Sequence, residues 1–181
     1  MPRTCKNCKK KFEPQYNSTQ MCCSYQCAAE YARKKREKEE KKAWTKEKKK
    51  RKEALKTKQD YEKDLEKVFN KFIRLRDKDL PCISCGKNPP FTLSAGHFYP
   101  AGSYKNIRFS EKNVHGQCWY DCNKKKHGNL LEYRRGLIKR FGEDYVKELD
   151  KMAQTPRKYE IFELKELIIE YKKKIKELES I

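Results

Sequence analysis

The stretch that decides the fold runs from Cys82 to Asn129: Cys82-Ile83-Ser84-Cys85, Ala95-Gly96-His97-Phe98, Asn113-Val114-His115, Cys118-Trp119-Tyr120-Asp121-Cys122-Asn123 and Lys126-His127-Gly128-Asn129. It contains two close cysteine pairs with a histidine between them. Four thiolates hold Zn²⁺ in a closed tetrahedron with no open coordination position. We therefore expect Cys82, Cys85, Cys118 and Cys122 to bind one structural zinc, which leaves the nearby polar side chains available for other chemistry.

Those polar residues fall at positions with a structural meaning. Gly86 can supply the tight turn after the first pair, and His97 marks the end of a short strand entering a loop. Asn123 is expected to open a helix directly after the last cysteine, and His127, four residues later, would share its helical face. A divalent ion held by that face would lie near the strand that carries His97.

A second cysteine group lies at the N-terminus. Cys5 and Cys8 are followed by Cys23 and Cys27, with Cys22 left over. The segment has too few apolar residues to form a core without a metal, so we expect a zinc knuckle or ribbon. Because Cys22 and Cys23 are adjacent, either could be the third ligand.

Composition points to a polyanionic partner. The chain of 181 residues is 40% charged and carries a net charge of +20, a field that attracts nucleic acid. No segment approaches the length of apolar sequence that a membrane span requires, and no apolar signal core precedes the first cysteines, so a cytoplasmic location is expected. Cysteines in close pairs within such a chain favour zinc over disulfides.

The middle of the chain is strongly basic. Between Arg33 and Asp60 there are 15 Lys and Arg against 6 Asp and Glu. Without Gly or Pro, the segment should be an exposed helix or a disordered basic linker. Its excess positive charge favours phosphate contact, with Arg33, Lys34, Lys35 and Arg36 as candidates.

Apolar periodicity predicts the remaining helices. One amphipathic stripe precedes Pro81, the apolar residues from Leu130 to Phe141 continue a helix that ends at Gly142, and Val146 and Leu149 mark another. The basic side of the Leu130 helix offers Arg134 and Arg135 to phosphate. After Pro156 a heptad-like stripe either packs on the chain itself or forms a homodimer. The members of the first and last stripes are Tyr61, Leu65, Val68, Phe69, Phe72 and Ile73, and Ile161, Leu164, Ile168, Tyr171, Ile175 and Leu178.

These phrases resemble the HNH, or ββα-metal, nucleases. In that family a strand histidine is the general base, a loop asparagine orients it, and a helix residue binds a catalytic metal, often beside a four-cysteine zinc. His97, Asn113 and Asn123 match these positions. With Arg108-Phe109, Gly128-Asn129 and the N-terminal cysteines, the chain looks more specifically like the NinG/Rap recombination endonucleases of lambdoid phages, which act on branched DNA.

What the resemblance implies is phosphodiester hydrolysis. Neutral His97 would take the proton of the attacking water, Asn113 would hold the histidine loop, and Asn123 would bind Mg²⁺ or Mn²⁺. Two departures stand out. Gly96 replaces the Asp or His that often binds the metal, which leaves His127 or His115 as substitutes, with His127 favoured. Cys118-x3-Cys122 is one residue longer than usual and could distort the start of the helix.

The sequence thus predicts a mostly helical α+β protein with a small zinc-stabilised HNH-like core. We expect an N-terminal zinc finger (residues 1–30), a basic linker and amphipathic helix (31–80), the core (81–153) and a heptad helix (157–181). The expected function is a metal-dependent endonuclease for Holliday junctions and D-loops, with Arg108 among its DNA contacts. The alternative is a DNA-binding recombination accessory that does not cut.

Overall fold

In the computed structural model, which describes residues 1–17 and 19–180, the chain divides into a first unit, Met1–Lys56, and a second, Thr57–Ile181. The fold is mostly helical, with two small antiparallel sheets of two strands each. In the part of the chain so described, no helix is both long and apolar enough to cross a bilayer.

The first unit joins a cysteine-rich segment to one long helix. Strands β1 (Arg3–Thr4) and β2 (Lys11–Phe12) form a short hairpin, and α1 spans Tyr25–Ala54. The Ser24 side chain accepts a hydrogen bond from the Cys27 amide and so caps the start of α1. No residue of α1 is buried. Of the two alternatives for the basic segment, the structure shows the exposed helix.

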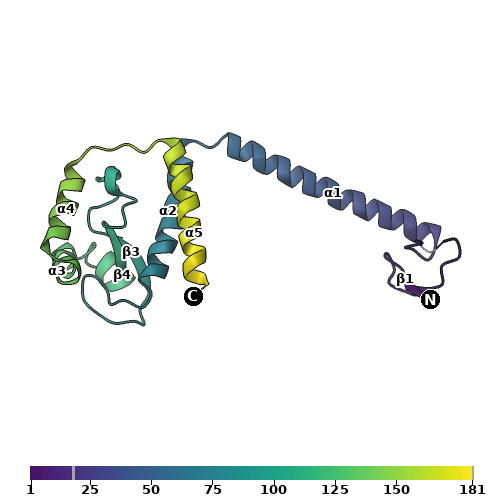
Figure 1. The fold of residues 1–181 in the computed structure, drawn as a ribbon, viewed down its shortest axis with the longest axis horizontal. Helices are drawn as coiled ribbons and strands as arrows, with labels where there is room; N and C mark the ends of the chain where they lie inside the picture. Colours follow the sequence, from purple (N-terminus) through teal and green to yellow (C-terminus); the bar gives the residue numbers. More distant parts are fainter. Residues whose placement is uncertain (18, 181) are drawn as a thin grey trace. The chain divides into compact units, whose positions relative to one another are not determined.

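The second unit is built on a helix pair. Helix α2 (Lys58–Arg76) starts at a capping box between Thr57 and Asp60, and α5 (Ile161–Glu179) lies beside it (Figure 1). The two predicted stripes meet in one core, where the rings of Phe69 and Tyr171 lie 4.9 Å apart. The C-terminal stripe therefore packs on the chain itself, so a homodimer would have to use another surface.

A two-stranded sheet lies between this pair and a second helical layer. Strand β3 (Leu93–His97) pairs with β4 (Val114–Cys118), with His97 opposite Val114 and Leu93 opposite Cys118. Because side chains alternate along a strand, Ala95 and Val114 reach the α2–α5 core while His115 points to the other face. That face meets α3 (Leu130–Phe141) and α4 (Glu143–Gln154) (Figure 1).

The links between these elements are short and specific. The loop from β3 to β4 contains a 3-10 turn, η1 (Lys105–Ile107), and β4 continues into a π-helical turn, η2 (Trp119–Lys124). Gly142, at a φ of 89°, ends α3 as predicted and turns the chain into α4. The apolar residues of α3 and α4 surround Phe98 in a second core.

Candidate functional site

The central four cysteines come together as the sequence predicts. The Sγ atoms of Cys82, Cys85, Cys118 and Cys122 all lie within 4.8 Å of one another, and two Sγ–Sγ distances are 3.9 Å and 3.8 Å. Thiolates at ~2.3 Å from a tetrahedral zinc would be separated by about 3.8 Å. The four thiols are free of disulfides and fit Zn²⁺. Burial, with smaller contributions from neighbouring thiols, raises the pKa of Cys122 to about 12, so four thiolates require a bound cation.

Local backbone geometry explains how these ligands meet. Gly86 takes a φ of 69°, and its amide donates to the Cys82 carbonyl at 2.9 Å, closing the first turn. The longer spacing between Cys118 and Cys122 is accommodated by the π-helical turn, in which the Lys125 amide donates to the Tyr120 carbonyl. The extra residue therefore does distort the start of the helix, as predicted, by widening the turn, and Cys122 stays within reach of the other three cysteines.

The N-terminal group selects one of the two adjacent cysteines. The Sγ atoms of Cys5, Cys8, Cys23 and Cys27 lie within 4.8 Å of one another, with the Cys8–Cys23 and Cys23–Cys27 pairs each at 3.6 Å. Cys22 is buried outside this group. The thiols therefore match a second tetrahedral zinc site with Cys23 as ligand.

His97 ends β3 with one ring nitrogen fixed. Its Nε2 lies 3.0 Å from the Arg108 carbonyl oxygen. A carbonyl only accepts hydrogen bonds, so Nε2 carries the proton and Nδ1 keeps its lone pair. Burial lowers the pKa of His97. The hydrogen bond to the Arg108 carbonyl raises it in part, and the positive charge of Arg108 lowers it further. The imidazole is therefore neutral near pH 7, with Nδ1 able to accept a proton.

Asn113 clamps the loop that follows His97. Its Oδ1 accepts from the Tyr99 amide at 2.8 Å, and its Nδ2 donates to the Tyr99 and Ile107 carbonyls at 3.0 and 3.4 Å. The Asn113 carbonyl also accepts from the Phe98 amide. This fully buried side chain thus ties β3, η1 and β4 together at the end where His97 lies.

Gln117 occupies the space beside Gly96, and sequence reasoning missed it. A Cβ at position 96 would overlap Gln117 Oε1 and lie 3.0 Å from its Cβ and Cδ. Gln117 is fully buried, donates from Nε2 to the Ser84 hydroxyl and the Gly128 carbonyl at 2.6 Å each, and leaves Oε1 without a partner. In the β3–β4 register Gln117 lies opposite Ser94 and Gly96 opposite His115, so Gln117 reaches Gly96 as a diagonal neighbour on the same face of the sheet, which spacing along the chain does not reveal. Position 96 therefore has no room for a metal-binding side chain.

Asn123 and His127 do not form the expected helical face. The π-helical turn holds Asn123, which donates from Nδ2 to the Ser94 hydroxyl at 3.0 Å. The chain then leaves helical geometry, with His127 exposed at a φ of 47°. Ser94 precedes His97 by three strand residues, so Asn123 meets the opposite face of β3 roughly 10 Å along it. The prediction that the asparagine and the imidazole face each other is wrong, because Asn123 is held at Ser94, whose side chain is on the opposite face of β3 from that of His97.

His115 is a core residue. Its Nδ1 lies 3.1 Å from the Tyr133 hydroxyl, and its Nε2 lies 3.3 Å from that of Tyr145. Tyr133 donates to the Gly96 carbonyl, so Nδ1 of His115 must donate to Tyr133. Burial lowers the pKa of His115 to about 3. Both ring nitrogens are thus engaged inside the protein, which disfavours metal binding by this histidine.

Most of the basic residues expected to contact DNA already have acidic partners. Arg108 donates to Glu66 at 2.8 Å, while Arg134 pairs with Asp150 and Arg135 with Glu132. In α1, the guanidinium and ammonium groups of Arg33, Lys34 and Lys35 lie within 4.0 Å of Glu37, Glu30 and Glu39. Arg36 has no ion pair among the described residues. Most of these residues are therefore already neutralised by a neighbouring carboxylate, so positive charge for phosphate contact has to come largely from other lysines and arginines.

The comparisons with known proteins agree on one family. The family model described as "Bacteriophage Lambda NinG protein" matches residues 1–180. The chain is 38% identical over 194 residues to Protein ninG of Escherichia phage lambda, covering 98% of this chain and 94% of that protein. It is also 38% identical to Protein ninG of Salmonella phage P22, with 97% and 93% covered. No solved structure matches. The chain belongs to the NinG family.

Proposed function

We propose that this chain is a structure-specific DNA endonuclease that cleaves branched recombination intermediates such as Holliday junctions and D-loops. The observation that carries the proposal is the fixed tautomer of His97: Nε2 is committed to the Arg108 carbonyl, so Nδ1 is the atom that can take a proton from water. Family membership and the resemblance to HNH nucleases supply the reaction class.

The second support is the arrangement that keeps His97 in place. Asn113 makes three side-chain hydrogen bonds to the surrounding loop, and the central cysteines fasten the other end of the same hairpin. Positioning residues of this kind raise the rate by holding a base in a productive geometry. Asn113 is in this proposal a positioning residue, and His97 is the general base.

The resemblance to HNH nucleases implies a catalytic metal, but the residues expected to bind it give little support for one. A divalent cation bound to a phosphodiester would stabilise the charge that develops on its oxygens. Gly96 offers no ligand, His115 is buried in a hydrogen-bonded core, and Asn123 meets the far face of β3. Within residues 1–17 and 19–180, the two cysteine groups are the only sets of three or more His, Cys, Asp or Glu that could hold a metal. The proposal therefore assigns no catalytic step to Mg²⁺ or Mn²⁺.

A cleavage assay tests the proposal. A labelled four-way junction and the matching linear duplex are incubated with the zinc-loaded protein in Mg²⁺, in Mn²⁺ and without either cation. We expect cleavage of the junction that His97→Ala abolishes and that declines only below the ordinary histidine pKa of ~6.5, because the pKa of His97 is lowered. Cleavage that persists in His97→Ala would refute the assigned role. His127→Ala reports whether the exposed histidine contributes.

A non-cleaving accessory protein is the second candidate. Gln117 favours it, because this buried side chain fills the space in which HNH enzymes often carry a metal ligand. In that case the same assay would show a retarded junction and no product, even in Mn²⁺. His97→Ala would then leave junction affinity unchanged.

A further inference from the structure

Helix α1 is long, exposed and polarised in charge. Its 30 residues include none that are buried, so packing does not stabilise it. Ion pairs with a spacing of four residues support it, as between Glu47 and Arg51 at 3.0 Å. At its start α1 contacts the cysteine-rich segment through Cys27 and Glu30, and beyond those first turns it has no core to cover and is exposed to solvent.

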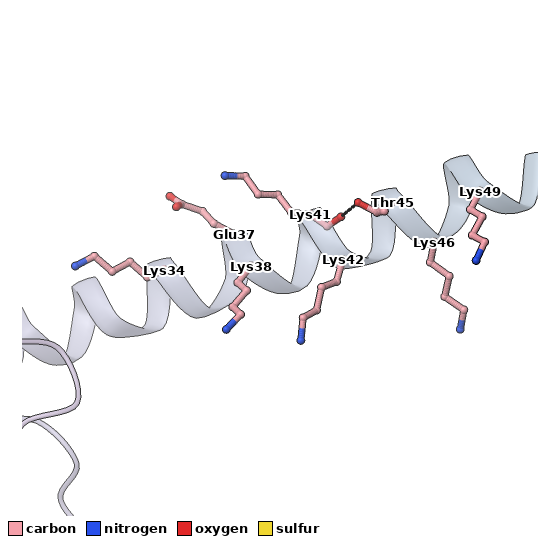
Figure 2. A pocket seen from close by; sticks show the side chains of 8 residues that line it. All are labelled: Lys34, Glu37, Lys38, Lys41, Lys42, Thr45, Lys46 and Lys49. Atoms are coloured by element: carbon pink, nitrogen blue, oxygen red, sulfur yellow. Dashed lines mark hydrogen bonds between the residues drawn. The ribbon is translucent and has the colours of Figure 1, made fainter. Parts of the chain in front are cut away.

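One side of α1 carries lysines without acidic partners. Figure 2 shows Lys38, Lys42, Lys46 and Lys49 pointing to the same side of the helix, and no ion pair is found for them among residues 1–17 and 19–180. We call these four residues the lysine row. The carboxylates Glu37, Glu40 and Glu47 fall on the other side of the helix by their spacing in sequence.

The lysine row costs the helix stability. Lys38, Lys42 and Lys46 follow one another at a spacing of four residues, and like charges so placed repel by a few tenths of a kcal/mol per pair. Glu39 is the carboxylate nearest the row by helical spacing, and its oxygen lies 4.0 Å from the ammonium group of Lys35. A polyanion bound along the row would offset the repulsion and release counterions.

The same strip of α1 continues toward the N-terminus into an aromatic groove. Tyr31 and Lys35 precede Lys38 at helical spacing and line a groove of about 790 Å³. Tyr16 and Tyr25 stand at this groove with 84% and 88% of their surface exposed. Large aromatic rings exposed beside a positive track have the composition of a single-strand binding surface, where bases stack on the rings.

We propose that the first unit binds single-stranded DNA, with phosphates along the lysine row and unpaired bases stacked on Tyr16 and Tyr25. The distance from Lys35 to Lys49 along the helix axis is about 21 Å, enough for several nucleotides. Duplex DNA fits the surface less well, because paired bases do not present their faces to the tyrosines. This binding does not require that the protein cleave DNA. It therefore goes beyond the proposed endonuclease activity and can be tested independently of it.

The lysine row is tested by the salt dependence of binding. Fluorescence anisotropy of a labelled oligothymidine is measured with the full-length, zinc-loaded protein over a series of salt concentrations. Changing Lys38, Lys42, Lys46 and Lys49 to Gln should reduce the slope of log affinity against log salt by about 2–3, at ~0.7 per phosphate contact. The matched control changes Arg33, Arg36, Lys48 and Arg51 to Gln, an equal loss of charge on the other side of α1 by helical spacing, and should move the slope by less than half as much. Equal changes in both variants would overturn the assignment.

The tyrosine groove is tested by comparing single strand with duplex. Tyr16→Ala/Tyr25→Ala should weaken oligothymidine binding at least about tenfold and alter duplex binding less than about twofold. Trp44→Ala removes an aromatic side chain that is 64% exposed on the other side of α1 and should change neither affinity. No loss of oligothymidine affinity, or an equal loss on duplex, would refute base stacking at these residues.

Two further measurements distinguish a loss of DNA binding from a loss of folding and from a loss of catalysis. Circular dichroism of each variant, free and with oligothymidine, shows whether α1 is retained. His97→Ala should bind oligothymidine as the unchanged protein does. If the protein binds oligothymidine but does not cleave the junction, the proposed endonuclease activity is rejected and the single-strand binding surface is not. If it cleaves the junction but does not bind oligothymidine, only the binding surface is rejected.

Discussion

Gly96 and Gln117 provide a test of the site by double substitution. In Gly96→Ala the added methyl would overlap Gln117 Oε1 and approach two of its carbons to 3.0 Å. Gln117 can move only by giving up two hydrogen bonds of 2.6 Å, at about 1 kcal/mol each. Overpacking of the core adds about 1–3 kcal/mol. We expect Gly96→Ala to lower the free energy of unfolding by about 3–5 kcal/mol.

The coupling between the two positions is the decisive quantity. Gln117→Ala is itself destabilising, because it leaves the Ser84 hydroxyl and the Gly128 carbonyl without a partner and creates a cavity. In the double variant the overlap with Oε1 is absent and only the 3.0 Å approach to Cβ of residue 117 stays, so its loss should be smaller than the sum of the single losses by about 1–3 kcal/mol. Strictly additive effects would show that Gln117 does not fill the space at position 96.

Urea unfolding measures these free energies if it reports on the second unit alone. The chain has two tryptophans, Trp44 in α1 and Trp119 in η2. In a Trp44→Phe background, emission from Trp119 follows the hairpin that holds Gly96 and Gln117. Midpoints and slopes are then compared at constant zinc. The same cycle with Gly96→Asp asks whether a metal-binding side chain fits only after Gln117 is shortened.

Three further predictions concern other parts of the fold. Gly136→Ala should destabilise the second unit by more than about 2 kcal/mol in the same unfolding assay, although alanine is the better helix former, because its Cβ would overlap the Ile83 carbonyl oxygen. Burial lowers the pKa of His115 in the folded protein to about 3, so its contribution to stability is complete above the unfolded pKa of ~6.5 and falls by about 1.4 kcal/mol per pH unit below it. Between about pH 7.5 and 5.5, His115→Gln should therefore lose about 1.4 kcal/mol less stability than the unchanged protein. An equal loss in both proteins would contradict the lowered pKa. Cys23→Ser should reduce the bound zinc measured by atomic absorption from two ions to one, whereas Cys22→Ser should leave two; the reverse pattern would identify Cys22 as the ligand.

The sequence by itself determined the two cysteine groups and the main helices. Cysteine spacing is a local property, so Cys82, Cys85, Cys118 and Cys122 could be grouped without knowledge of the fold. The stripe containing Phe69 and the stop at Gly142 were likewise readable from neighbouring residues. Sequence also limited the final stripe to two alternatives, and the structure places it against α2.

Tertiary structure decided which polar residues meet. The faces of β3 depend on its register with β4, and this register sets His97 apart from Asn123 and brings Gln117 over Gly96. One added residue before Cys122 became a π-helical turn, which ended the helical phase that would have aligned His127 with Asn123. Pairing across strands and burial between layers join residues distant in sequence, so spacing along the chain does not encode them. For the same reason, only coordinates showed His115 locked in the core and the unpaired lysines gathered on one side of α1.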